Sequence, residues 1–280
     1  MLFAVAHPYV VGAQRTKYAA LDSLASETTR LTARYADRRI AAAEGYRRLG
    51  ADFPSMGEHW LNTAALLDGR LDASRPTLLL YATIAGKPTL LGVGFVTTTR
   101  GDSSIPGVAG WPVAWHEHSG LLADESGVAP GKGSPTDTHV WVVHAWTSLR
   151  NPAGAFAPDN WLLPFARAQL PLPPVPDPLA SLAVALATTG DVYLRGVLTD
   201  AGARTSLNAP AVDAAIASAR ARVLSLVSGA RAKEALSSED LSALRAEWLA
   251  LAAALHALIG PSVERYLMPA HDTMTGEDPP

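Results

Sequence analysis

Histidines and tryptophans are concentrated in the middle of the chain. Between Glu58 and Trp146 lie five of the eight histidines and five of the seven tryptophans of the 280-residue sequence. The strongest pattern is His116-Glu117-His118, because residues two apart in an extended strand project to the same side. Two neutral imidazoles on one side of a strand are half of a site for Zn, Cu, Fe or Ni. The pattern predicts a metal centre, with two exposed loop histidines as the alternative.

Two further segments offer ligands to the same centre. Glu58 and His59 follow the turn-forming run Ser55-Met56-Gly57, so a carboxylate and an imidazole are presented side by side. His139 and His144 are five residues apart on one predicted strand and therefore face opposite sides of it. We prefer His144, because a specific Asn-Pro-x-Gly turn follows it, and His139 stays open as its replacement. A hydrogen-bonded packing histidine is the alternative in each segment.

Together these residues predict one site with histidine ligands, an acidic neighbour and an aromatic pocket. The predicted metal ligands are His59, His116, His118 and His144. Glu58 is the predicted catalytic residue, as a general base beside the metal. Three tryptophans are predicted to line a substrate pocket: Trp60, Trp115 and Trp146. Aromatic neighbours of this kind exclude water and hold the orientation of ligand rings.

The composition excludes several kinds of catalytic, metal and binding site. The sequence contains no cysteine, which excludes disulfides, thiolate nucleophiles, iron–sulfur clusters and cysteine-ligated zinc. The expected cofactor is therefore one divalent metal ion bound by nitrogen and oxygen, with Fe, Zn or Cu as the leading identities. A net charge of −3 with 18% charged residues implies no basic surface, so we expect no nucleic-acid partner. Neither a serine-hydrolase elbow nor a phosphate-binding loop is present, and Gly92-Val-Gly94 lacks the third glycine of a dinucleotide site.

The sequence predicts neither a signal peptide nor a membrane span. The first residues lack a charged segment followed by a long apolar core, so no signal peptide is predicted and a cytoplasmic location is expected. An exported mature form stays open. No run of about 18 uncharged apolar residues occurs, so no membrane span is expected.

The hydrophobic patterns predict an α+β fold with a long N-terminal helix, an antiparallel sheet with long functional loops, and a C-terminal group of packed helices. The tight turn between the strands at 76–84 and 89–97 requires an antiparallel pair. The predicted helices cover 13–50, a short segment or turn at 58–67, and then 178–188, 210–231 and 238–266. The predicted strands cover 76–84, 89–97, 116–118 (inside long loops over 100–138) and 139–147. The predicted domains are 1–168 (α+β), 169–178 (proline-rich linker), 179–268 (helical) and 269–280 (flexible tail).

Several segments in order resemble a family of bacterial proteins of unknown function. The resemblance covers residues 30–165 and is carried mainly by Met56-Gly57-Glu58-His59, then by the His-x-Trp and Asn-Pro-x-Gly-x-Phe motifs between His144 and Phe156. It implies that Glu58, His59 and one strand histidine occupy motif positions. The family brings no established activity, and this chain departs from its pattern at Ala145.

From these observations we expect a mononuclear metal enzyme, of oxygenase or of hydrolase or lyase type, acting on a small apolar or aromatic molecule. The alternative is a non-catalytic metal- or ligand-binding protein, in the manner of a stress-related oligomer, that forms a homo-oligomer through its apolar C-terminal helices. A purely structural assembly protein is a third class. The sequence does not specify the substrate.

Overall fold

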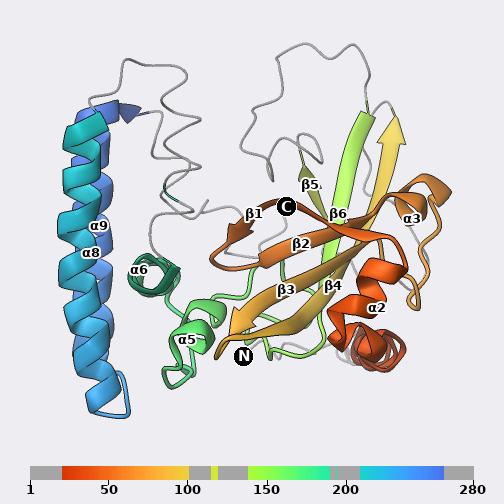
Figure 1. Ribbon diagram of the computed structural model, residues 1–280, viewed down its shortest axis with the longest axis horizontal. Coiled ribbons are helices and arrows are strands. Elements are labelled where there is room, and N and C mark those ends of the chain that lie inside the picture. The colour runs from red at the N-terminus through yellow and green to blue at the C-terminus, as the bar shows by residue number, and fades with distance from the viewer. Residues whose placement is uncertain (1–20, 101–114, 119–137, 190–193, 195–208, 262–280) are drawn as a thin grey trace, which may run out of the picture.

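A computed structural model of the protein describes residues 21–100, 115–118, 138–189, 194 and 209–261. Its centre is a six-stranded antiparallel sheet with the strand order β1-β2-β3-β4-β6-β5, with helices on both faces (Figure 1). The α+β class predicted from the sequence is therefore confirmed. The strands are β1 (Tyr46–Phe53), β2 (Gly57–Asn62), β3 (Leu78–Ile84), β4 (Lys87–Arg100), β5 (His116–His118) and β6 (Thr138–Trp146).

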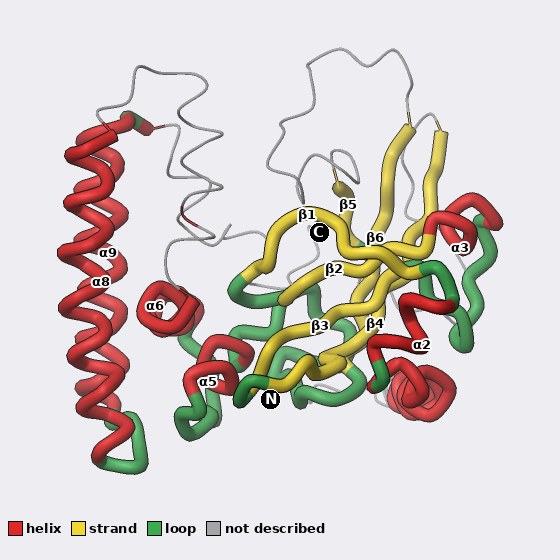
Figure 2. The backbone as a smooth tube through the Cα atoms, in the orientation of Figure 1, coloured by secondary structure: helices red, strands yellow, loops and turns green. Residues whose placement is uncertain are grey.

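The predicted hairpin and the two histidine-bearing strands are present. Strands β3 and β4 pair antiparallel across the turn at Ala85-Gly86, and β6 pairs with β4 along nine residue pairs from Gly92 to Arg100. The short strand β5 adds to the outer side of β6. Most of the long loops predicted over 100–138 lie outside the described residues. Figure 2 shows that the sheet is strongly coiled, with β1 and β2 crossing the direction of β4 and β6.

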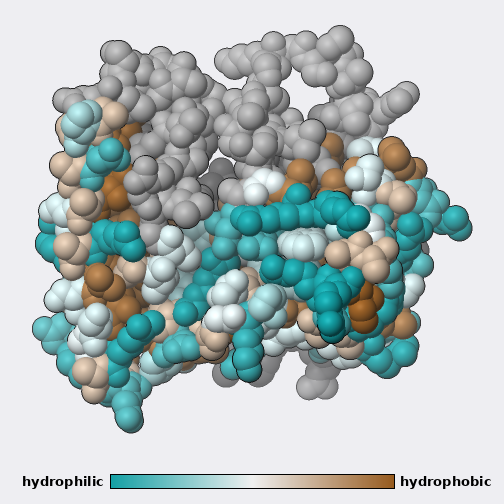
Figure 3. Space-filling model, viewed as in Figure 1, coloured by the Kyte–Doolittle hydropathy of each residue, from teal (hydrophilic) through white to brown (hydrophobic). Residues whose placement is uncertain are grey.

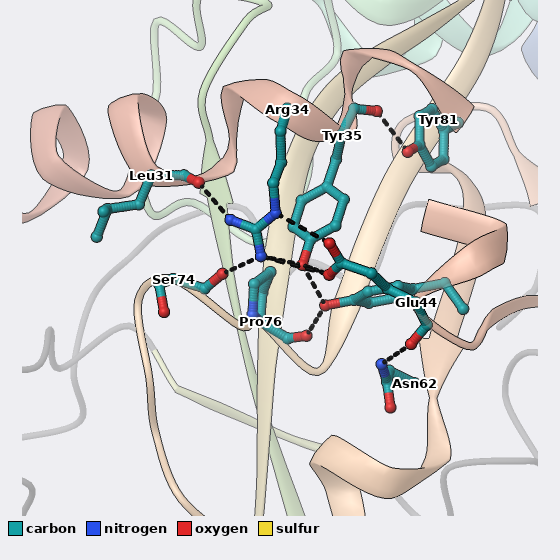
Figure 4. A network of polar contacts seen from close by, with 9 residues as sticks. Leu31, Arg34, Tyr35, Glu44, Asn62, Ser74, Pro76 and Tyr81 are labelled. Atoms are coloured by element: carbon teal, nitrogen blue, oxygen red, sulfur yellow. Dashed lines mark hydrogen bonds and ion pairs between the residues drawn. The ribbon is translucent and has the colours of Figure 1, made fainter. Parts of the chain in front are cut away.

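One face of the sheet is covered by N-terminal helices. Residues 21–32 are helical, and the 3-10 turn η1 (Ala33–Ala36) and helix α2 (Arg38–Ala43) follow. A polar network fixes these elements to the sheet (Figure 4). The Tyr35 hydroxyl donates to Glu44 Oε2 at 2.7 Å, Arg34 pairs with Glu44 at 3.2 Å, and Tyr81 Oη donates to the Tyr35 carbonyl at 2.6 Å. Burial raises the pKa of Tyr35 and Tyr81, and the Tyr35 hydrogen bond lowers the pKa of Glu44.

The prediction of one helix over 13–50 is wrong beyond Thr32. Asp37 has extended backbone angles (φ −88°, ψ 104°) and caps the separate helix α2 by accepting from Arg39 N. Gly45 then takes a φ of +95°, which favours glycine, and the chain enters β1 at Tyr46. The second helix expected over 58–67 is wrong in its first half, because 57–62 form strand β2, and correct in its second half, where α3 (Thr63–Asp68) ends at the left-handed Gly69.

The C-terminal helices form a bundle of their own beside the sheet. They are α5 (Leu163–Ala168), α6 (Pro178–Thr189), α8 (Ala209–Ala232) and α9 (Ser238–Ile259). The helices predicted over 178–188 and 210–231 are confirmed, and the helix predicted over 238–266 ends earlier, at Ile259. Ser237 and Asp240 form a capping box at the start of α9. The apolar row of α9 faces the other helices of this bundle, with Trp248 1% exposed.

Helix α5 and its flanks connect the helical bundle to the sheet. Leu163 packs with Leu80, Leu91 and Trp146 on the sheet face opposite to α2. The guanidinium of Arg167 pairs with the Asp52 carboxylate of β1, with a 3.0 Å bond from Nη1 to Oδ2. By length and composition α9 is the one described helix that could cross a membrane, although core helices pass the same test, and 28% of its apolar stretch is buried.

Candidate functional site

Three of the predicted ligands meet on the sheet face that α5 covers. His59 of β2 and His144 of β6 are each 1% exposed, and their ring centroids lie 5.6 Å apart. The ring of His116, on β5, lies 5.2 Å from the ring of His144. The three rings come from three strands and form a histidine cluster in which His144 contacts both of the others.

The coiling of the sheet brings the rings together. Strands β3 and β4 separate β2 from β6, so a flat sheet would hold their backbones about 14 Å apart. Gly94 lies directly across from His144 on β4, and a Cβ there would meet His144 Cδ2 at 3.3 Å and Leu78 Cβ at 3.1 Å. The absence of a side chain at Gly94 therefore leaves the space that the His144 ring occupies.

One ring nitrogen of His144 is hydrogen-bonded to the backbone. Its Nδ1 lies 2.7 Å from the carbonyl oxygen of Pro158. A carbonyl can only accept, so Nδ1 carries a proton and donates, and in the neutral ring Nε2 is the nitrogen that keeps a lone pair. Metal-binding histidines are commonly oriented in this way by a backbone carbonyl.

The segment 151–160 that supplies this carbonyl is itself tied to the sheet. Trp146 Nε1 donates to the Ala157 carbonyl at 2.7 Å, and Asn151 Nδ2 donates to the Asp159 carbonyl at 2.7 Å. These bonds fix the backbone on both sides of Pro158. The sequence predicted a structured turn here, but no residue type in it marked the Pro158 carbonyl as a partner of His144.

A buried carboxyl joins this segment to the turn that precedes His59. Ser55 Oγ donates to Asp159 Oδ1 at 2.5 Å, and Asn160 N donates to the Ser55 carbonyl at 2.9 Å. Burial raises the pKa of Asp159, and the hydrogen bond from Ser55 partly opposes that effect. The sequence marked Ser55 only as part of a turn and did not indicate its contact with Asp159, because 104 residues separate the two.

Glu58 lies on the opposite face of β2 from its neighbour His59. Its carboxylate pairs with Arg38 at 3.3 Å and with Arg48 at 3.7 Å, and it accepts from Trp60 Nε1 at 3.2 Å. The Arg38 guanidinium stands 4.9 Å from the centre of the Trp60 ring. The structure does not bring Glu58 together with the histidines, and Glu58 instead belongs to the contacts between α2 and the sheet.

The three predicted pocket tryptophans are also divided between the faces. Trp60 packs edge-on against Tyr81, with ring centroids 5.5 Å apart, and Trp115 is buried in the same cluster under the N-terminal helices. Trp146 alone lies beside the histidines, 6.2 Å from the ring of His144. The side chains of His118 and His139 lie outside the described part of the structure.

The spacing of the rings is compatible with a shared metal ion. With zinc–nitrogen distances of about 2.0–2.1 Å and tetrahedral angles, imidazole centroids around one ion are about 5 Å apart. The two observed separations, 5.6 and 5.2 Å, are close to this value. Among the described side chains, however, no group of three or more His, Cys, Asp or Glu is arranged to hold a metal ion, so binding would require the rings to move.

Comparison with protein families, with characterised proteins and with solved structures finds no match to this chain. The resemblance to a bacterial family therefore stays a prediction. Any function has to be inferred from the chemistry of the site residues themselves.

Proposed function

We propose that His59, His116 and His144 bind one divalent transition-metal ion, and that this ion is the reaction centre of an enzyme for a small apolar or aromatic molecule. One observation supports the proposal above the others. Imidazoles from three strands cluster around His144, with centroids 5.6 Å (His59) and 5.2 Å (His116) from its ring, and the His144 ring is oriented by a backbone carbonyl.

The surroundings of the rings suit a ligand site. The Phe53 ring meets His59 edge-on at 5.5 Å, and Trp146 flanks His144, so apolar surface borders the histidine cluster. Three histidine ligands are the donor set of catalytic zinc sites, where the fourth position holds water. When bound, zinc would supply an activated water for hydrolysis or lyase chemistry, whereas iron or copper would supply oxygen chemistry.

Access to the histidine cluster would be from the side of β5. His116 is partly exposed, while His59 and His144 are buried. His118 is the second ligand candidate on the same short strand, and we retain it as a fourth ligand to be tested. Glu58 has no place in this proposal, because it serves a salt bridge on the other face.

A non-catalytic metal-binding protein is the second candidate. The observation that favours it is the burial of His59 and His144, each 1% exposed, which would hold an ion away from solvent. The two candidates differ in whether an open coordination position remains. Cobalt(II) substitution distinguishes them, because added azide or cyanide changes the visible spectrum only where a ligand can reach the ion.

The test is metal analysis of tag-free protein by mass spectrometry, followed by titration of metal-free protein with zinc, iron(II) and copper(II). The expected result is one equivalent for the wild type. Single replacements His59→Gln, His116→Gln and His144→Gln should each weaken binding at least ten-fold, about the effect of losing one ligand interaction of 1.4 kcal/mol or more. His118→Gln tests the fourth ligand. His256→Gln in α9 is the matched control and should bind as the wild type does.

A wild-type protein that takes up none of the three metals would contradict the proposal. So would equal losses of affinity in the His256→Gln control and in the three site variants, since the metal would then bind to surface histidines. Unchanged binding in His118→Gln alone would remove that residue and leave the three-histidine site.

A further inference from the structure

Helix α9 carries an apolar side that points away from the helical bundle. Its buried residues recur every three or four positions, and the opposite side exposes Ala246, Leu249, Ala250, Ala253, Ala257 and Leu258. No charged residue occurs between Trp248 and Ile259. The most apolar 18 residues of the helix have a mean hydropathy of 1.3, yet 28% of that stretch is buried. This degree of exposure is unusual for so apolar a helix.

Helix α8 extends the same surface. It runs antiparallel to α9 along the edge of the molecule (Figure 1). Its exposed residues include a row of small side chains (Ala214, Ala217, Ala221, Ser225 and Ser228) and Leu224, besides the charged Asp213, Arg220 and Arg222. Arg222 and Glu247 pair at 2.6 Å across the two helices and neutralise each other. In the space-filling view this edge shows apolar and pale residues between hydrophilic ones (Figure 3). Small side chains let another helix approach closely, with axes about 8 Å apart.

We propose that the outer side of the α8–α9 hairpin binds the same side of a second copy of this chain, giving a four-helix contact in a two-fold dimer. A largely apolar surface can pair with the same surface of a second copy, as a two-fold interface requires. The 22 residues of α9 span about 33 Å, and two adjacent helices are about 20 Å wide. The contact would bury about 650 Å² of each partner, or about 1,300 Å² in total, within the range of stable interfaces.

A membrane is the less suitable partner for this surface. The uncharged run Trp248–Ile259 is about 18 Å long as a helix, whereas the apolar core of a bilayer is about 30 Å thick. The charged residues Arg245 and Glu247 precede the run directly. A second copy needs no such length, since it meets the helices side by side.

The test is the molar mass of the full chain at about 10 μM, measured by size-exclusion chromatography with light scattering, and the dissociation constant by sedimentation. The wild type should have about twice the mass of the 29.4 kDa chain. Ala250→Glu/Ala253→Glu places like charges opposite each other and should raise the dissociation constant about a hundred-fold. Ala64→Glu/Leu67→Glu, an exposed pair three apart on α3, is the matched control and should stay dimeric.

A monomeric wild type would overturn the proposal, and flotation of that monomer with phosphatidylcholine vesicles would assign the surface to a lipid interface instead. An Ala250→Glu/Ala253→Glu variant that remains dimeric, with the circular dichroism of the wild type, would place the interface elsewhere. If that variant fails to fold, Leu249→Gln and Leu258→Gln, tested singly, replace it, and an unchanged dissociation constant in both would overturn the proposal.

Discussion

The neighbours Glu58 and His59 offer the sharpest test of the site, because the sequence predicts that they act together and the structure places them on opposite faces of β2. The perturbation is Glu58→Gln, which removes the charge and keeps an oxygen that can accept from Trp60 Nε1. Because the two side chains lie on opposite faces of β2, this change should lower stability and leave metal binding intact. His59→Gln, in contrast, should weaken metal binding.

The expected loss follows from the geometry of the Arg38 pair. At 3.3 Å and an effective dielectric constant of about 20, the gross attraction is about 5 kcal/mol, most of which desolvation offsets. The side chains of Glu58 and Arg38 are 13% and 26% exposed, so this pair is intermediate between a surface ion pair and a buried one. A surface pair contributes about 0–1 kcal/mol, and breaking a buried pair costs about 3–5 kcal/mol. We therefore expect Glu58→Gln to lower the free energy of unfolding by about 2 kcal/mol. Arg48→Gln should cost less than about 0.5 kcal/mol, because Arg48 is 49% exposed.

Urea denaturation of metal-free protein measures the first effect, and cobalt(II) or zinc titration measures the second. Glu58→Gln should keep the wild-type affinity for metal, whereas His59→Gln should weaken it at least ten-fold. A Glu58→Gln protein that loses metal binding but unfolds at the wild-type urea concentration would refute the reasoning. Glu58 would then face the histidines, as a catalytic base must.

Three further predictions concern other parts of the fold. Burial raises the folded-state pKa of Asp159, so its stabilising contribution is present below the unfolded pKa of about 3.9 and is lost as the pH rises through the folded pKa. Asp159→Asn should therefore be more stable than the wild type at about pH 7 but not at about pH 3.5. An equal difference in stability at both pH values, measured by urea titration, would contradict this prediction. Gly94→Ala puts a methyl group 3.3 Å from His144 Cδ2, which should cost about 1–3 kcal/mol and weaken zinc binding about ten-fold, and calorimetry showing unchanged affinity would count against the site. Trp248→Ala should cost about 3–5 kcal/mol in thermal or urea unfolding, since Trp248 is buried at the centre of the helical bundle, and a loss below about 1 kcal/mol would show that this bundle is loosely formed.

The parts of the fold that sequence could predict are those with a strong local period. The C-terminal helices have apolar residues at helical spacing, and Ser237 and Asp240 supply a capping box for α9. The β3–β4 hairpin has a turn at Ala85-Gly86 between two apolar runs. In both cases the local preference and the tertiary contacts agree.

The N-terminal prediction failed where local preference was misleading. Residues 38–50 continue an alanine- and arginine-rich helical pattern, but Asp37 and Gly45 break it at both ends of α2. The strand Gly57–Asn62 was missed for the opposite reason, since its alternation is short and half of its six residues are polar. That alternation already separates Glu58 from His59, because successive residues of a strand face opposite sides, so the division of the two could have been predicted had the strand been recognised.

The meeting of the histidines depends on the whole sheet and not on any local pattern. Burial of His144, which the sequence left open against His139, follows from its place on the face covered by α5. Its approach to His59 further requires a coiled sheet and a glycine at position 94, neither of which can be read from the spacing of the histidines.

This arrangement has a mechanical consequence for the proposed metal. In the strand order β1-β2-β3-β4-β6-β5, His59 stands one strand from one edge of the sheet and His116 stands on the other edge. An ion bound by both histidines would connect the two ends of the coiled sheet through side chains. The backbone hydrogen bonds of the sheet, in contrast, connect only neighbouring strands. Binding to the folded state alone stabilises it by about 4 kcal/mol when the free metal is about a thousand times its dissociation constant. The short strand β5, which is three residues long and among the described residues pairs only with β6, is the element that would gain most from such a connection.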